Sequence, residues 1–208
     1  MPLTKEPLTA PHYDRAVDYA LSRLRTELRP ELCYHNIDHT VEEVLPAAMK
    51  LASYYDLSEE ERQLLRTAAA FHDLGFIYNS VGHEIASARV AAQKLPDFGF
   101  DDRQIEIIMG IIIATRLPQM PHNLLEEIMA DADLDVLGCE EFLEYNELLR
   151  CERLVLGQPQ TPCEWYDEQI VFIEQHTYFT DAARELREEG KQRNILKLQR
   201  LLQECLES

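Results

Sequence analysis

The amino-acid sequence predicts an all-α protein that folds as a single globular domain. Apolar residues recur every three or four positions along one segment after another, and several segments open with residues typical of helix N-caps. The alternating pattern of β-strands is almost absent. With 208 residues, 46% of them hydrophobic, the chain can bury one substantial core.

Four helices are expected in the first half of the chain, over residues 13–28, 38–55, 58–75 and 82–95. In the first, the apolar pattern stops before Pro30, because the residue before a proline disfavours helical geometry. The second contains Pro46, which should kink it. The third begins with the capping-box pair Ser58 and Glu61 and ends at Gly75.

Five more helices are expected, over residues 101–115, 123–138, 140–156, 162–175 and 180–204. Asp101 and Asn123 are the expected N-caps of the first two, with Gln104 and Glu126 as capping partners. The helix from Asp101 is apolar nearly all round, which favours a central, buried position. We expect one domain over 1–208, with a core at about 30–140 and the helices of about 140–208 packed on it.

The charge and the cysteines restrict the class of protein. A net charge of −18 would repel a nucleic-acid duplex, and a small anionic substrate would need a local cation such as a bound metal. The five cysteines form no CxxC pair and are expected to be thiols. The longest apolar run is too short to cross a bilayer, so we expect a cytoplasmic protein with no membrane partner.

The stretch FHDLG places His72 and Asp73 at the end of an apolar helix. Both continue apolar stripes, four residues after Ala68 and Ala69, and are therefore expected to point inward. Burying an ionised carboxylate without a positive partner costs several kcal/mol, comparable to the whole stability of a domain. A divalent cation would remove this cost, and a hydrogen-bonded His-Asp pair at a helix end is the alternative.

The stretch YHNIDHT supplies two more histidines, His35 and His39, at the start of the second helix. They share a face if the helix begins at His35; otherwise His35 lies in the preceding loop and leans over the site. The alternative is that Asn36 or Asp38 caps the helix and leaves both histidines exposed.

The stretch ADADLDVLG places Asp131, Asp133 and Asp135 at alternating positions in an otherwise apolar helix. Asp133 lies on one stripe with Met129 and Leu137. A run of aspartates usually marks a solvated face, but the surrounding Ile, Met, Leu and Val leave little room for one here.

Together these segments resemble the signature of the HD superfamily of metal-dependent phosphohydrolases: a histidine, an adjacent His-Asp pair, and a distant aspartate on a later helix. The similarity covers about residues 30–180 and is greatest to the small bacterial branch of predicted HD phosphohydrolases. YHNIDHT is also similar to the metal-site motif of cyclic-nucleotide phosphodiesterases, whose larger catalytic domain does not fit in 208 residues. The resemblance implies an HD-type helical bundle with additional C-terminal helices.

The resemblance also implies a set of site residues. The metal ligands would be His39, His72, Asp73 and Asp133, with Asp131 as the rival of Asp133. The implied reaction is hydrolysis of a phosphomonoester or phosphodiester of a small molecule, for example a nucleotide, by hydroxide bound to the metal. His35 would be the general acid, and Asp73 counts among the catalytic residues. The implied cofactor is one divalent ion of Mn, Fe, Co, Mg or Zn, with His83 as the candidate ligand of a second.

Four residues are candidates for contacts with a small phosphorylated substrate. Arg116, at the end of the apolar fifth helix, could bind a phosphate through two parallel hydrogen bonds. The alternative, of equal weight, is that Arg116 is an ordinary surface residue in a loop. Tyr34, Tyr78 and Asn79 are expected near the entrance of the site. A homodimer is compatible with the sequence.

Two other functions stay open at this point. The first is a di-iron oxygenase of HD type, which would need His83 and His122 as extra ligands and would be identified by iron content and O₂ consumption. The second is a non-catalytic ligand-binding or signalling module stabilised by metal, whose melting temperature would fall on chelation while no substrate released phosphate.

Overall fold

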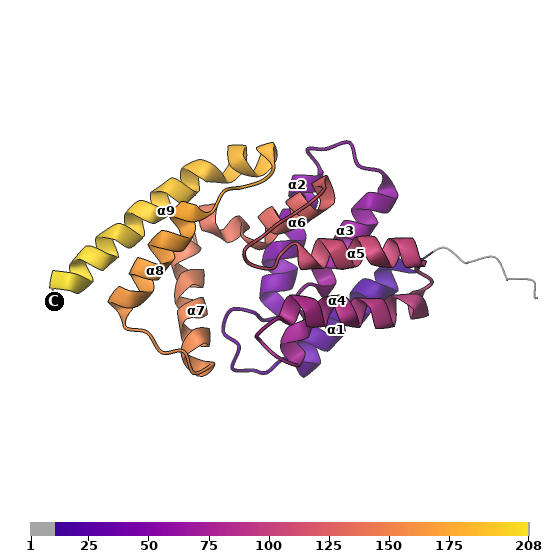
Figure 1. Ribbon diagram of the computed structural model, residues 1–208, viewed down its shortest axis with the longest axis horizontal. Helices are drawn as coiled ribbons and strands as arrows, with labels where there is room; N and C mark the ends of the chain where they lie inside the picture. The colour runs from indigo at the N-terminus through magenta and orange to yellow at the C-terminus, as the bar shows by residue number, and fades with distance from the viewer. Residues whose placement is uncertain (1–10, 208) are drawn as a thin grey trace, which may run out of the picture.

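The computed structural model describes residues 11–207, and within them the chain is helical, as the sequence predicts (Figure 1). The α-helices are α1 (Tyr13–Glu27), α2 (Leu45–Ala52), α3 (Glu59–Phe71), α4 (His83–Lys94), α5 (Asp102–Ile113), α6 (Leu124–Asp133), α7 (Phe142–Val155), α8 (Pro162–Gln175) and α9 (Asp181–Glu207). Short 3₁₀ helices cover Leu74–Ile77, Leu95–Phe98 and Asp135–Gly138, and a π-helical segment, His39–Val44, leads into α2. This part of the chain contains no β-strand.

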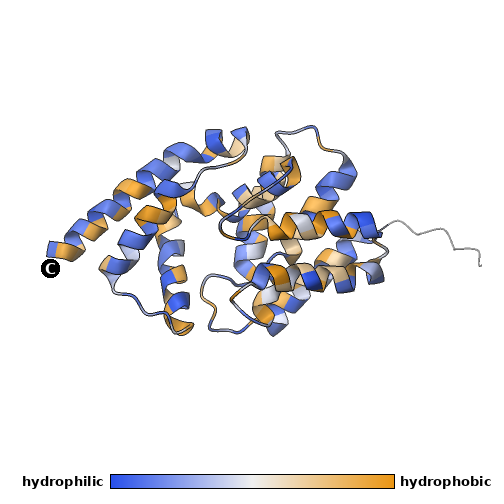
Figure 2. Cartoon of the chain, in the orientation of Figure 1, coloured by the Kyte–Doolittle hydropathy of each residue, from blue (hydrophilic) through white to orange (hydrophobic). Residues whose placement is uncertain are grey.

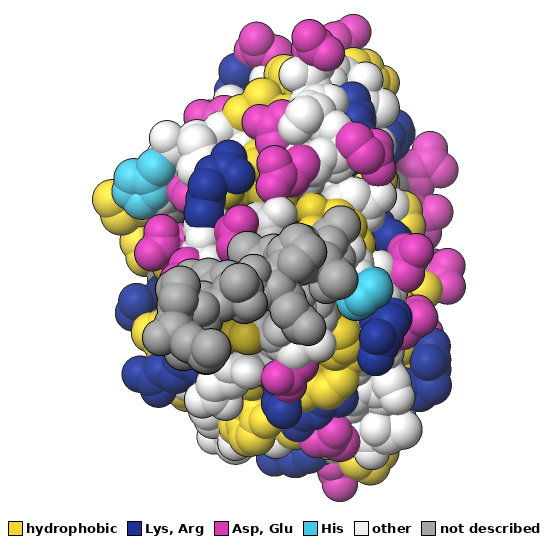
Figure 3. Space-filling view, turned by 90° about the vertical axis from the view of Figure 1, so that its right-hand side faces the viewer, with side chains coloured by type: hydrophobic (Ala, Val, Ile, Leu, Met, Phe, Trp, Pro, Cys, Tyr) yellow, Lys and Arg dark blue, Asp and Glu magenta, His cyan; other side chains and the backbone are white. Residues whose placement is uncertain are grey.

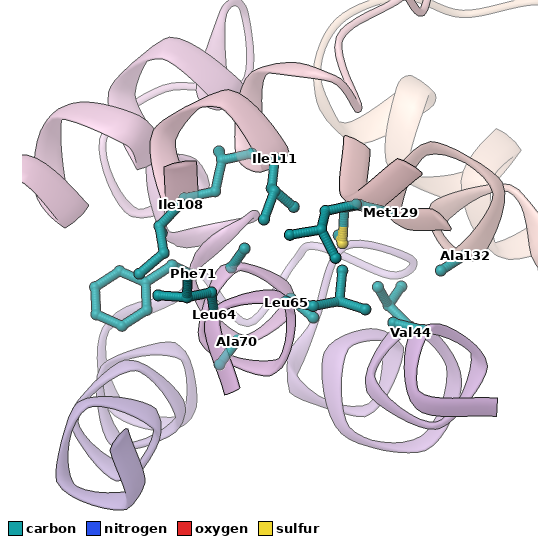
Figure 4. Close-up of a cluster of buried hydrophobic side chains, with 14 of the residues drawn as sticks. Val44, Leu64, Leu65, Ala70, Phe71, Ile108, Ile111, Met129 and Ala132 are labelled. Atoms are coloured by element: carbon teal, nitrogen blue, oxygen red, sulfur yellow. The ribbon is translucent and has the colours of Figure 1, made fainter. Parts of the chain in front are cut away.

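The helices pack around two apolar clusters. The larger one joins α1 to α6, and Leu65, Phe71, Ile108 and Met129 meet at its centre (Figure 4). The smaller one lies between α7, α8 and α9, which sit together at one side of the α1–α6 bundle (Figure 1). Tyr178, just before α9, is fully buried in the larger cluster and connects the two parts. The division into a core and appended helices remains a prediction.

Two of the three expected N-caps form as capping boxes. Ser58 and Asp101 accept hydrogen bonds from the backbone N–H three residues on, and the side chains there bond back to the N-cap N–H. Asn123 also caps its helix, but Glu126 bonds instead to the backbone N–H of His122 and to the Asn123 side chain. The helix starts were therefore well predicted.

The helix ends differ from the prediction at the polar motifs. The third helix was expected to reach Gly75, but α3 ends at Phe71, and a 3₁₀ turn follows Asp73. The sixth was expected to reach Gly138, but α6 ends at Asp133. In both places the chain leaves α-helical geometry where a carboxylate turns toward the site described below, which periodicity alone does not reveal.

Pro46 lies just after the point where the π-helical segment His39–Val44 passes into α2, so the helical geometry changes beside the proline, and the kink remains a prediction. One further expectation is corrected. The fifth helix is not buried on all sides: Ile108, Ile111 and Ile112 are buried, but Ile113 is 37% exposed. Figure 2 shows hydrophobic and hydrophilic residues sharing each helix, as expected for helices with one face in the core.

The prediction that all five cysteines are thiols is wrong for two of them. Cys163 at the start of α8 and Cys205 at the end of α9 form a disulfide, because these two helices run alongside each other and bring the Cα atoms within 5.7 Å. Cys33, Cys139 and Cys151 are free.

The surface in Figure 3 carries acidic and basic side chains interspersed, so on that face the negative charge of the chain is not gathered into one patch. Among residues 11–207, no helix has the length and the apolar character needed to cross a membrane.

Candidate metal centre

Three segments far apart in sequence bring His39, His72 and Asp133 together. His39 opens the π-helical segment, His72 follows α3, and Asp133 is the last residue of α6. One ligand atom from each lies within 4.8 Å of the other two. The Asp133 Oδ1 atom is 3.6 Å from His39 Nε2 and 3.4 Å from His72 Nε2. Two imidazoles and a carboxylate are a common ligand set for a divalent transition metal.

Both imidazoles are oriented by hydrogen bonds on the far side of the ring. His72 Nδ1 donates to the backbone carbonyl of Ala69 at 2.7 Å, and His39 Nδ1 donates to Glu43 Oε2 at 3.1 Å. Because Nδ1 makes this hydrogen bond in each ring, Nε2 is the nitrogen that faces the centre, and its lone pair becomes available to a cation once its proton is displaced. Histidines that bind metals are typically held in this way by a partner on the other nitrogen.

Asp73 lies beside the cluster, in surroundings that would suit a cation. Its Oδ2 atom is 3.2 Å from His72 Nε2 and 3.8 Å from His39 Nε2. Asp73 is 2% exposed, and within residues 11–207 neither its Oδ2 atom nor His72 Nε2 has a hydrogen-bond partner. No Lys or Arg of the described chain forms an ion pair with it. Buried polar atoms rarely lack partners, so these two point to a ligand between them.

The close approach of these carboxylates and imidazoles also shifts their pKa values. Burial lowers the pKa of His39, but contacts with Asp133 and Glu43 and the charge of Asp73 outweigh this and raise the pKa to about 9. Burial also opposes the shift at His72, and the charge of Asp73 nevertheless raises that pKa well above 6.5. Burial is the largest influence on the pKa of Asp73 and raises it, but His72, His35 and His83 together outweigh burial and bring the pKa below its usual range. Without a cation, the raised pKa values favour protonated His39 and His72 beside the carboxylates, and metal binding would displace these protons.

His35 lies beside this cluster and is held by a residue that sequence reasoning missed. Glu152 on α7 is 1% exposed, and its Oε1 atom accepts a hydrogen bond from His35 Nδ1 at 2.5 Å. Its Oε2 atom accepts from the backbone N–H groups of Tyr34 and His35, both at 2.9 Å. Glu152 follows Cys151 on a helix with no motif of its own, and 117 residues separate it from His35, so the sequence carried no signal for this contact.

The three aspartates of ADADLD have three different surroundings. Asp133 faces the histidines, as described. Asp131, its expected rival, is fully buried away from them and accepts hydrogen bonds from the backbone N–H groups of Phe179 and Thr180 and from the Thr180 hydroxyl. Asp135 forms an ion pair with Arg187 on α9. The geometry thus places Asp133, and not Asp131, with the other ligands.

His83, expected as a ligand of a second ion, lies on the other side of Asp73. Its Nε2 atom is 3.5 Å from Asp73 Oδ1, and its Nδ1 atom donates to the Ser80 carbonyl. The ring stacks on Phe76, whose other neighbour is the ring of His35. Gly75 permits this approach, because a Cβ atom there would lie 1.9 Å from the His83 carbonyl oxygen. His122 is far more exposed and bonds to Glu126.

A cavity of about 330 Å³ opens over the cluster and extends between α7 and α8. His35, His39, Asp73, Asp133 and Tyr34 line it. The other three residues expected to contact substrate are Arg116, Tyr78 and Asn79. They are exposed and do not line it. Tyr78 instead accepts a hydrogen bond from Arg23 on α1.

Comparison with known proteins agrees with this geometry. The family model described as "HD domain" matches residues 36–135, which contain all four expected ligands. A crystal structure of a predicted HD superfamily hydrolase from an uncultured Thermotogales bacterium is 23% identical, covers 93% of each chain and superposes with a TM-score of 0.61. At that identity the likeness shows a shared fold. No curated protein matches the sequence.

Proposed function

We propose that the protein is a metal-dependent hydrolase of small phosphoesters, because the HD-domain family model matches residues 36–135, where the motifs lie. The observation that supports this best is the cluster of His39, His72 and Asp133, with the unpartnered oxygen of Asp73 beside it. The solved relative described as a predicted HD superfamily hydrolase is consistent with this chemistry. The substrate class, a phosphomonoester or phosphodiester of a small molecule, is part of the proposal.

Four residues, His39, His72, Asp73 and Asp133, would hold the divalent ion. When bound there, such an ion neutralises phosphate charge and acidifies a water ligand, which makes a nucleophile available near neutral pH. The buried position of the imidazoles keeps their Nε2 atoms aimed at this point, and Glu43 and the Ala69 carbonyl keep them from rotating.

His35 would supply the proton to the leaving oxygen. Its Nδ1 atom is committed to Glu152, so Nε2 is the nitrogen from which a proton can reach a substrate in the cavity. The hydrogen bond from Nδ1 to the Glu152 carboxylate and the stacking on Phe76 fix the orientation of the ring. Holding the acid in one orientation before substrate arrives removes part of the entropic barrier.

The experiment is a phosphate-release screen of purified protein, stripped of metal and reloaded separately with Mn²⁺, Fe²⁺, Co²⁺, Mg²⁺ or Zn²⁺. We expect hydrolysis of at least one nucleotide or simple phosphate ester, with metal required. His72→Ala and Asp73→Asn should lower kcat by about a hundredfold or more, because each removes a ligand. His122→Ala, an exposed histidine outside the cluster, is the control. Equal rates for both variants and the parent protein would refute the proposal.

A further inference from the structure

We propose that the part of the cavity between α7 and α8 binds the organic group of the substrate. We further infer that this group is uncharged, largely apolar and carries a hydrogen-bond acceptor. The inference rests on the proposed function only in placing the phosphate at the metal ligands.

The first argument is continuity. One cavity joins the ligands His39 and Asp73 to apolar side chains of the C-terminal helices, among them Phe142, Leu149 and Phe172. A phosphoester whose phosphate contacts the ligand cluster must therefore extend its remaining atoms along this apolar wall. Aromatic walls favour a flat ring, and about 330 Å³ is small for a ligand site, so one ring system is the expected size.

The second argument is charge. Arg153 is the one Lys or Arg among the residues that line the cavity. Its charge is already paired: Nη1 donates to Glu168 Oε1 at 2.5 Å, and the guanidinium lies 5.2 Å from the centre of the Trp165 ring. An anionic substituent on the organic group would thus meet a cation that already has a carboxylate partner, and it would also meet that carboxylate, because Glu168 lines the same cavity. Such a group would lose hydration without gaining a partner.

The third argument is a hydrogen-bond chain whose direction is fixed by Trp165. Its buried indole N–H can only donate, and it donates to Asn146 Oδ1 at 2.7 Å. The Asn146 amide nitrogen must then be the donor to Gln169 Oε1, at 2.9 Å. The Gln169 amide nitrogen is left as a donor, and within residues 11–207 it has no acceptor. Gln169 is only 5% exposed and lines the cavity. An unpaired donor on a residue that lines the cavity favours a ligand with an acceptor.

The test measures binding and does not depend on turnover. Three non-hydrolysable phosphonates, (4-acetylbenzyl)-, (4-isopropenylbenzyl)- and (4-carboxybenzyl)phosphonate, share one shape and differ in the distal group: an acceptor, an apolar group and an anion. Their Kd values for Mn²⁺-loaded full-length protein would be measured by calorimetry. We expect the acetyl compound to bind about fivefold more tightly than the isopropenyl compound, and the carboxylate at least about tenfold more weakly than the acetyl compound.

Gln169→Glu tests the donor directly. This change keeps an oxygen toward Asn146 and places a second oxygen where the N–H group was, so the preference for acetyl over isopropenyl should disappear. Gln175→Glu, exposed on the same helix, makes the same charge change and should leave the preference intact. If Gln169→Glu does not fold, Leu149→Phe, half-buried in the wall, is the second variant and should weaken binding of the acetyl and isopropenyl compounds about fivefold.

The outcomes separate the two proposals. Equal Kd values for the acetyl and isopropenyl compounds, tighter binding of the carboxylate, or an unchanged preference in folded Gln169→Glu would overturn the inference. The expected ranking together with no hydrolysis of any ester would leave this binding site standing and refute the proposed function.

Discussion

Glu152→Gln is the substitution that most directly tests the role of the pair formed by His35 and Glu152. The carboxylate accepts three hydrogen bonds, two from backbone N–H groups and one from His35 Nδ1, and it is almost completely buried. Glutamine has the same shape but a single acceptor oxygen. If that oxygen stays with the two N–H groups, its NH₂ group faces Nδ1, and the imidazole must turn from donor to acceptor there.

The expected losses of stability and of kcat in Glu152→Gln follow from the hydrogen bonds that change. A hydrogen bond to a charged group contributes about 1.5–3 kcal/mol, and a neutral one about 1 kcal/mol. Weakening three such bonds while keeping the shape should lower the free energy of unfolding by about 2 kcal/mol. The protonated form of His35 loses its carboxylate partner, so we expect kcat to fall about a hundredfold for esters with a poor leaving group, which need a proton, and much less for 4-nitrophenyl esters.

The assay compares kcat for an alkyl phosphate and for 4-nitrophenyl phosphate in the parent protein and the variant, with circular dichroism to verify the fold. Glu147→Gln, on the same helix but paired at the surface with Arg150, is the matched control and should change neither rate. Were Glu152→Gln to lower both rates by the same factor, or neither, the assignment of His35 as a proton donor oriented by Glu152 would be wrong.

Three other substitutions test separate parts of the structure. Gly75→Ala should destabilise the protein by about 2 kcal/mol in chemical denaturation and weaken metal binding, because a methyl group there collides with the backbone of His83; an unchanged stability would contradict the close approach. Asp131→Asn should lower stability by about 1–2 kcal/mol through the hydrogen bonds to Thr180 at the start of α9 and leave metal affinity unchanged, whereas lost metal affinity would make Asp131 a ligand. Burial, aided by the charge of Lys191, lowers the pKa of His176 from 6.5 to about 4. As the pH falls from 6.5 toward 4, His176 therefore binds a proton in the unfolded chain but not in the folded protein, and the free energy of unfolding decreases. His176→Phe should reduce the loss of stability between pH 7 and pH 5 by about 1 kcal/mol, a figure that allows for solvent around the partly buried ring. If the parent protein and the variant show the same pH dependence of stability, the lowered pKa of His176 is wrong.

The sequence predicted the helical fold and singled out His39, His72 and Asp133, which the structure brings together, because both predictions depend on local patterns. Helix starts are set by side chains three residues apart, as at Ser58 and Glu61. His72 and Asp73 were identified because inward-pointing polar groups on an apolar stripe need a partner, and no cation on their own helix could reach them. The helix ends were predicted less well: α3 ends at Phe71 and α6 at Asp133, each followed by a 3₁₀ turn, and the spacing of apolar residues does not mark this change of geometry.

The contacts made by α7 and α8 could not be predicted from the sequence. Glu152 and Gln169 lie on helices that look ordinary in sequence, and their partners are known only once these helices are placed against the bundle and against each other. This division has a physical basis. The ligand cluster needs residues whose burial is costly without a cation, and that cost is visible in each local pattern. The wall of the cavity contains apolar side chains and one directed amide, which any core could contain, so the specificity proposed for it would arise from three-dimensional placement.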